Sequence, residues 1–462
     1  MRNFLSSVAV TASLLTPAGA QPFPETDYRT IVDFGDLLQA VGASLPDGQT
    51  VDVALVEARM NGRYLPNLNS SEFTGKTLTD QSQIATGTSN HATGSAVRLF
   101  GNSSSMTPGV VTVDLYDAEN YLGASLNSGT ASAPDVHTID VASHSYIFST
   151  DRPPFAPEIN RRLDLTASRD NVTHVVGTNN RATNPIPQGF AQTYNAITVG
   201  KSDGDHAAGP TTINGAGRVK PDIVAPQSTT SAATPVVGSA AVLMRAVGGD
   251  GGNPNAVQHE VTKAVLMAGA AKDGIPSWDQ TPQRPLDERY GAGQLNVLNS
   301  YRILDAGEFD AGQTTDAPAR GWDYGDPLTA GGVAEYQFGF DTDVADASFL
   351  LTWDAIIGDS GGVLDYDLLD VPDLTLTLFA VDGSGGTTLF ATSDSPVDNV
   401  EHLYFRNLAA GDYRLSVGSN AGSTTTDFAL AWRVTAVPEP SVLSAFGVFG
   451  ALALKRRRPV AV

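Results

Sequence analysis

The sequence predicts an α/β fold, a doubly wound parallel sheet flanked by helices, followed by an all-β sandwich module. The chain has 462 residues, which makes two domains the natural expectation. Up to about residue 305, apolar strand-like runs alternate with helical patterns, as is typical of βαβ units. Beyond that point, short β-rich runs are separated by Gly, Asp and Ser, a spacing that favours a sandwich.

Composition narrows the classes of function. The net charge is −22, hydrophobic residues make up 41% of the chain, and there is no cysteine. This hydrophobic content indicates a packed protein rather than a disordered acidic one. The absence of cysteine excludes disulfides, thiolate metal sites and cysteine nucleophiles. Acidity argues against nucleic acid as a partner, because phosphate binding needs clustered Lys and Arg.

The first 20 residues have the order of a secretory signal peptide. A positive start at Arg2 precedes an apolar run, Val8 to Leu15, and then the small residues Ala18-Gly19-Ala20 before Gln21. We therefore predict that residues 1–20 direct export. The alternative is an amphipathic first helix.

Residues 21–305 form the predicted α/β domain. Apolar runs predict strands and amphipathic runs predict helices. The predicted strands include 51–56, 138–142, 172–176 and 196–199, and the predicted helices include 92–100, 159–168 and 234–247.

Residues 306–435 form the predicted sandwich. This segment holds 21 acidic residues against 4 arginines and no lysine, so most of the negative charge of the chain lies here. Over Asp373 to Val417, Leu-Thr-Leu-Phe-Ala-Val-Asp leads to Ala-Ala-Gly-Asp-Tyr-Arg-Leu-Ser-Val. This strand pattern resembles that of accessory modules after secreted bacterial proteases, and a carbohydrate-binding module is the alternative. The predicted strands are 334–340, 348–353, 374–380, 403–405, 413–417 and 428–434.

The acidic turns of the sandwich raise the question of calcium. Asp365, Asp367 and Asp370 lie close together in sequence, but no EF-hand spacing is present. We predict no metal site and no cofactor, and keep structural calcium with unknown ligands as the alternative to a solvated acidic surface.

Three polar residues of the α/β domain supply the components of acyl transfer. Glu57 ends an apolar strand, His91 begins a helical run, and Ser231 precedes an Ala/Val-rich helix. A hydroxyl, an imidazole and a carboxylate can act as nucleophile, general base and orienting group. Taken singly, each residue is also explained as a salt-bridge partner or a helix cap.

Five segments around these residues follow one another in a familiar order. They are Val53-Ala54-Leu55-Val56-Glu57, Asn90-His91-Ala92-Thr93-Gly94, Lys220-Pro221-Asp222-Ile223-Val224-Ala225-Pro226, Thr230-Ser231-Ala232-Ala233-Thr234-Pro235 and Tyr290-Gly291-Ala292-Gly293-Gln294-Leu295-Asn296. In this order they resemble the motifs of the subtilisin-like serine proteases over roughly residues 30–305. The resemblance implies a subtilisin-like sheet and a serine endopeptidase acting on protein or peptide substrates.

The same resemblance implies a role for each residue. Ser231 would be the nucleophile, His91 the general base, and Glu57 the group that holds the imidazole. The segment Val175-Val176-Gly177-Thr178-Asn179-Asn180 occupies the place of the family's oxyanion turn. Asn179 fits best if Gly177 aligns with the family's alanine, and Asn180 is the alternative donor.

The chain departs from the family pattern at several positions. Glu57 replaces the family's aspartate, Gly94 replaces its second histidine, and Thr229 replaces a glycine. Only four residues separate Pro226 from Ser231, where the family has a longer excursion. These departures define the alternative function, a catalytically degenerate relative that serves as a surface binding or adhesion protein.

The last segment, residues 436–462, resembles a PEP-CTERM sorting tail. Pro438, Glu439 and Pro440 precede an uncharged stretch, 441–454, and a basic cluster, 455–458. The resemblance implies that the stretch inserts transiently into the membrane and that an exosortase recognises the motif and processes the tail. Basic residues favour the cytoplasmic side of a membrane. We therefore expect the cluster 455–458 inside the cell and the rest of the protein at the cell surface or in the extracellular matrix. An uncleaved anchor is the alternative.

Overall fold

The computed structural model describes residues 8–11, 27–84, 87–150, 154–275, 277–362 and 365–437. Of the predicted signal peptide it describes only the backbone of strand β1 (Val8–Thr11), which pairs antiparallel with β6 (Ile147–Thr150). The motif Pro438, Glu439 and Pro440 and the tail that follows lie outside the described residues.

A seven-stranded parallel sheet forms the centre of the first domain, which confirms the predicted α/β class. The strand order is β11-β8-β7-β5-β2-β4-β3. After β2, the chain forms β3 and β4 on one side of β2 and then crosses over to form β5 on its other side. The switch in direction lies beside β2, where open α/β sheets place their sites. The strands are β2 (Val53–Glu57), β3 (Thr77–Asp80), β4 (Thr112–Asp117), β5 (Val141–His144), β7 (Thr173–Gly177), β8 (Ile197–Lys201) and β11 (Ile223–Ala225).

Helices cover both faces of this sheet. Neighbouring residues of one strand show the two faces, since Val175 packs in the core with α6 and Val176 packs with α5. The helices are α1 (Asp27–Ile31), α2 (Phe34–Val41), α3 (Asn90–Phe100), α4 (Ala118–Asn120), α5 (Phe155–Asp170), α6 (Thr230–Asp250), α7 (His259–Gly269) and α8 (Val297–Asp305). Shorter elements are the helical turns Gly42–Ser44, Ser71–Phe73, Tyr121–Ser125 and Pro254–Val257 and the strands β9 (Gly209–Pro210) and β10 (Val219–Lys220).

Helix α6 is the central helix of the domain. Among the described residues it is the one helix that is long and apolar enough to cross a membrane, and 83% of its apolar window is buried. It packs on β5, β7, β8 and β11. These contacts identify it as a core helix of the α/β domain.

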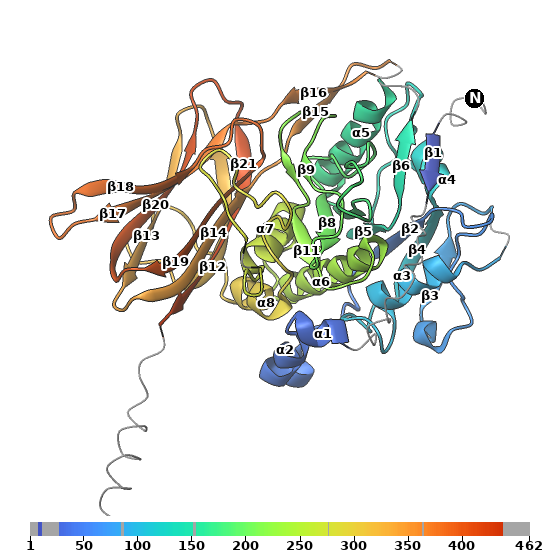
Figure 1. Cartoon of the computed structure of the whole chain (residues 1–462), viewed down its shortest axis with the longest axis horizontal. Helices are drawn as coiled ribbons and strands as arrows, with labels where there is room; N and C mark the ends of the chain where they lie inside the picture. The colour runs from blue at the N-terminus through green and yellow to red at the C-terminus, as the bar shows by residue number, and fades with distance from the viewer. Residues whose placement is uncertain are drawn as a thin grey trace, which may run out of the picture.

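Two antiparallel four-stranded sheets follow, as predicted. Their orders are β12-β21-β14-β19 and β13-β20-β17-β18, and a hairpin, β15-β16, extends from them over α5 (Figure 1). The strands are β12 (Arg320–Leu328), β13 (Val333–Phe340), β14 (Val344–Thr352), β15 (Ile356–Asp359), β16 (Tyr366–Asp370), β17 (Leu374–Val381), β18 (Thr387–Ser393), β19 (Val400–Leu408), β20 (Gly411–Ser419) and β21 (Thr426–Ala436).

The hydrophobic core of the first domain extends into the sandwich, which also has a core of its own. Helix α7 lies against β21, β14 and β12, between the parallel sheet and the sandwich (Figure 1). The core cluster that contains α6 and α7 also contains Trp322, Leu350 and Ala431 of the sandwich. We call this contact the domain seam.

Candidate active site

Glu57 and His91 form a buried pair at the carboxyl edge of the sheet. Glu57 is the last residue of β2, and its Oε2 lies 2.6 Å from His91 Nδ1. His91 is the second residue of α3, whose start is fixed by the Ser89 hydroxyl accepting a hydrogen bond from the Ala92 N–H. The Glu57 side chain is 1% exposed and that of His91 is 10% exposed. The longer acid therefore reaches the imidazole.

The contact with Glu57 raises the pKa of the His91 imidazole. Burial alone lowers the pKa of His91, but the charge and the hydrogen bond of Glu57 outweigh it, and the net pKa lies above the ordinary value of 6.5. A carboxylate on Nδ1 fixes the tautomer and leaves Nε2 as the proton acceptor. The second oxygen of Glu57, Oε1, is buried and has no hydrogen-bond partner within the described part of the chain.

A second ion pair lies beside Glu57. In the register of β2 and β4, Glu57 is opposite Asp117, which is fully buried. Arg59 binds both oxygens of Asp117, at 2.7 and 2.8 Å. The guanidinium therefore compensates the carboxylate that would otherwise repel Glu57.

Ser231 lies in the first turn of α6. The side chain of Thr229 caps this helix by accepting a hydrogen bond from the Ala232 N–H. The Ser231 hydroxyl lies 3.2 Å from the Thr229 hydroxyl, and among the described contacts no hydrogen bond joins it to His91. Both α3 and α6 begin at the carboxyl edge of the sheet, so His91 and Ser231 lie at the same edge.

Asn180 braces the start of the same helix. Its Oδ1 accepts hydrogen bonds from the Thr230 N–H at 2.8 Å and from the Thr230 hydroxyl at 3.2 Å. Because Thr230 binds Oδ1, the Nδ2 atom of Asn180 lies on the opposite side of the side-chain amide. Asn179 has its backbone carbonyl bound to the Ala207 N–H. The side chain of Asn180 therefore contacts the residue directly before Ser231.

Gly177 allows this close approach. A Cβ at this position would lie 2.8 Å from the Thr234 hydroxyl in the second turn of α6. The absence of a side chain lets the end of β7 contact the helix directly, which brings the Asn179-Asn180 turn to its N-terminus.

The hypothesis that Asn180 is an oxyanion donor predicts that Asn180→Asp lowers kcat about 10²–10³-fold with little change in KM, as loss of one such donor does. The carboxylate keeps an acceptor for Thr230 but removes the N–H donors and adds a negative charge. Peptide hydrolysis kinetics with Asn179→Asp as the control measure the effect. An equal loss in both variants would contradict the assignment of Asn180.

A cleft of about 430 Å³ opens beside the histidine. It is lined by Met60, Asn61, Arg63 and residues 88–91, which include His91 itself. The cleft gives the imidazole an approach from solvent.

Sequence reasoning missed several neighbours of this site. The Thr229 contact with Ser231 and the Arg59 clamp on Asp117 were not predicted. A threonine directly before a helix is itself an N-cap signal, so the role of Thr229 as a cap could have been recognised. Asp365, Asp367 and Asp370 belong to neither of the two clusters of metal-ligating side chains among the described residues.

Comparison with known proteins gives weak similarities. No protein-family model matches the chain, and no curated protein sequence matches it. Similar solved structures include a cold-adapted subtilisin-like serine proteinase, with a TM-score of 0.33 and 17% identity, covering 54% of this chain and 88% of that one.

The mitogen from Yersinia pseudotuberculosis has a TM-score of 0.17 and 17% identity, covering 25% of this chain and 86% of its own. A protein from Sulfurospirillum deleyianum has a TM-score of 0.16 and 12% identity, covering 24% and 95%. At these TM-scores the likeness assigns neither a family nor an activity.

Proposed function

We propose that this chain is a serine endopeptidase of the subtilisin-like class, with Glu57, His91 and Ser231 as its catalytic residues. The observation that carries the proposal is the buried 2.6 Å contact between Glu57 Oε2 and His91 Nδ1. It is the arrangement that prepares an imidazole to accept a proton at Nε2 and that stabilises the imidazolium afterwards.

In the proposed reaction Ser231 Oγ attacks the scissile carbonyl carbon while His91 Nε2 takes the hydroxyl proton. The C–N bond then breaks, and His91 returns the proton to the leaving amine. Water repeats the sequence on the acyl-enzyme and releases the acid. The amide of Asn180 and the N-terminal end of α6 stabilise the oxyanion.

The hydroxyl of Ser231 must leave Thr229 to take part in this reaction. A neutral hydrogen bond of this kind stabilises a protein by about 1 kcal/mol. Substrate binding can offset such a cost, so the contact slows the nucleophile without excluding it.

Fluorophosphonate labelling tests the proposal, since it requires an activated serine. We expect the folded parent to be labelled once and Ser231→Ala to be unlabelled. Ser228→Ala removes an exposed hydroxyl three residues earlier and is the matched control, which should be labelled like the parent.

Thr229→Ala gives a second comparison, since it removes the hydroxyl that contacts Ser231. We expect this variant to react faster than the parent by about fivefold, the rate equivalent of about 1 kcal/mol. If neither folded parent nor Thr229→Ala is labelled, the endopeptidase proposal is wrong, and the binding-protein alternative replaces it.

We also propose that the enzyme acts outside the cell, after export and exosortase processing at Pro438-Glu439-Pro440. The end sequences support this proposal. Mass spectrometry of the surface-released protein should find a chain without residues 441–462, and a released protein that retains them would contradict it.

A further inference from the structure

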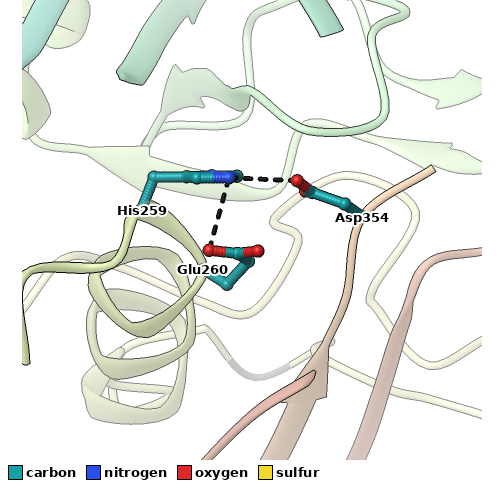
Figure 2. A group of neighbouring side chains, drawn as sticks. All are labelled: His259, Glu260 and Asp354. Atoms are coloured by element: carbon teal, nitrogen blue, oxygen red, sulfur yellow. Dashed lines mark hydrogen bonds and ion pairs between the residues drawn. The ribbon is translucent and has the colours of Figure 1, made fainter. Parts of the chain in front are cut away.

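A second cluster of polar side chains lies at the domain seam, away from the proposed active site. His259 and Glu260 are the first two residues of α7, and Asp354 follows β14 of the sandwich. His259 Nε2 lies 3.0 Å from Asp354 Oδ2 and 3.3 Å from Glu260 Oε2. Figure 2 marks both contacts with dashed lines. The two carboxylates therefore converge on one imidazole nitrogen.

We propose that His259, Glu260 and Asp354 bind a divalent transition-metal ion of the zinc class, which joins the sandwich to the α/β domain. Around such an ion, ligand atoms about 2.0–2.2 Å from the metal are about 3–3.5 Å from one another. The two measured separations fall in this range, and all three ligand atoms lie within 4.8 Å of one another.

Burial distinguishes the cluster from a surface group of acids. His259 is 3% exposed and Glu260 is 6% exposed. Glu260 Oε2, which lies 3.3 Å from His259 Nε2, is buried and has no hydrogen bond among the residues that the structure describes. An unbonded buried carboxylate oxygen is costly, and a metal ion would satisfy it.

The cluster also borders a cavity that has room for the remaining ligands. The cavity measures about 450 Å³ and is lined by all three residues together with Tyr324 and Asp427. Water in this cavity can complete a tetrahedral shell. The Tyr324 hydroxyl donates to Asp427 Oδ2 at 2.5 Å, so this acid already has a partner.

The carboxylates around this site favour a cation. Glu260 and Asp354 both lie close to His259, and Asp427 lines the same cavity. A divalent ion would compensate the charge of these acidic groups.

The chemical types of the three donor atoms indicate which metal ion the site would bind. One imidazole nitrogen with two carboxylates suits zinc and its neighbours, whereas calcium takes six to eight oxygen ligands. The described part of the chain holds one other such cluster, Glu308, Asp310 and Asp323, made of oxygens alone. There Glu308 already accepts from Asn253 and Asn255, which makes it a suitable control.

The test uses the tag-free protein, stripped of metal and titrated with Zn²⁺, Co²⁺ and Ca²⁺ by calorimetry. We expect one equivalent of Zn²⁺ to bind and Co²⁺ to give visible d–d absorption. Asp354→Asn should weaken Zn²⁺ binding more than the about 10–100-fold that loss of an outer-shell partner costs. Asp310→Asn, in the control cluster, should bind Zn²⁺ like the parent.

Circular dichroism checks that each variant is folded, and Glu260→Gln, which preserves the shape of the side chain, provides the same comparison if Asp354→Asn does not fold. No Zn²⁺ uptake by the parent, binding of Ca²⁺ alone, or equal affinity in the site and control variants would overturn the proposal. The readout is metal binding, so it is independent of whether Ser231 is an active nucleophile.

Discussion

Glu57→Gln is expected to lower kcat for peptide hydrolysis about 10⁴-fold while changing KM little. A glutamine can hold the imidazole in the wrong tautomer and cannot stabilise the imidazolium, and a loss of this size follows the corresponding Asp→Asn change in a Ser-His-Asp triad. Glu119→Gln is the matched control, because Glu119 lies at the same sheet edge, where it pairs with Arg59 at 3.5 Å.

The pH profile distinguishes this role from a merely structural one. The net pKa of His91 is raised above 6.5. Protonated His91 cannot act as a base, so activity of the parent should fall as the pH drops through this raised pKa. Removal of the Glu57 charge lowers the pKa of His91, and the acid limb of the variant should move to lower pH. An unmoved limb in a folded variant would show that Glu57 does not act on His91.

Leu350→Ala is expected to reduce the free energy of unfolding by about 2–5 kcal/mol, as loss of a buried leucine does. Leu350 lies on β14, is fully buried, and belongs to the core cluster that spans the domain seam. Because that cluster is continuous, we expect one calorimetric transition in the parent and one, at lower temperature, in the variant.

Leu389→Ala is the control for this change. Leu389 lies on β18 and is 60% exposed. Its truncation should change the free energy of unfolding by no more than about 0.5 kcal/mol. Two separate transitions in the parent, of which Leu350→Ala shifts only one, would mean that the seam does not couple the two domains.

Local sequence patterns predicted the strands of the parallel sheet more accurately than the starts of the helices. The run 172–176 predicted a buried strand, and β7 occupies Thr173–Gly177. Helix α6 begins at Thr230, four residues before the predicted start at 234, because the Thr229 side chain caps it there. In the structure the Thr229 cap begins the helix earlier and leaves Pro235 inside it.

Contacts between distant residues could not be obtained from local patterns. Residue spacing alone does not bring Glu57 to His91, 34 positions away; the resemblance to a family named them together. His259 and Asp354 are 95 positions apart and belong to different domains. Each is unremarkable in its own segment, and only the packing of α7 against the sandwich brings them together.

The contact between α7 and the sandwich also affects how the chain folds while it is being synthesised. Chains fold from the N-terminus as they are synthesised, so residues up to Asp305 emerge before the strands that cover α7. Until β14 and β21 arrive, the buried apolar residues Val261, Val265 and Leu266 of α7 belong to a core that is still incomplete. A chain truncated between the two domains would therefore expose apolar residues of α7 that the complete chain buries.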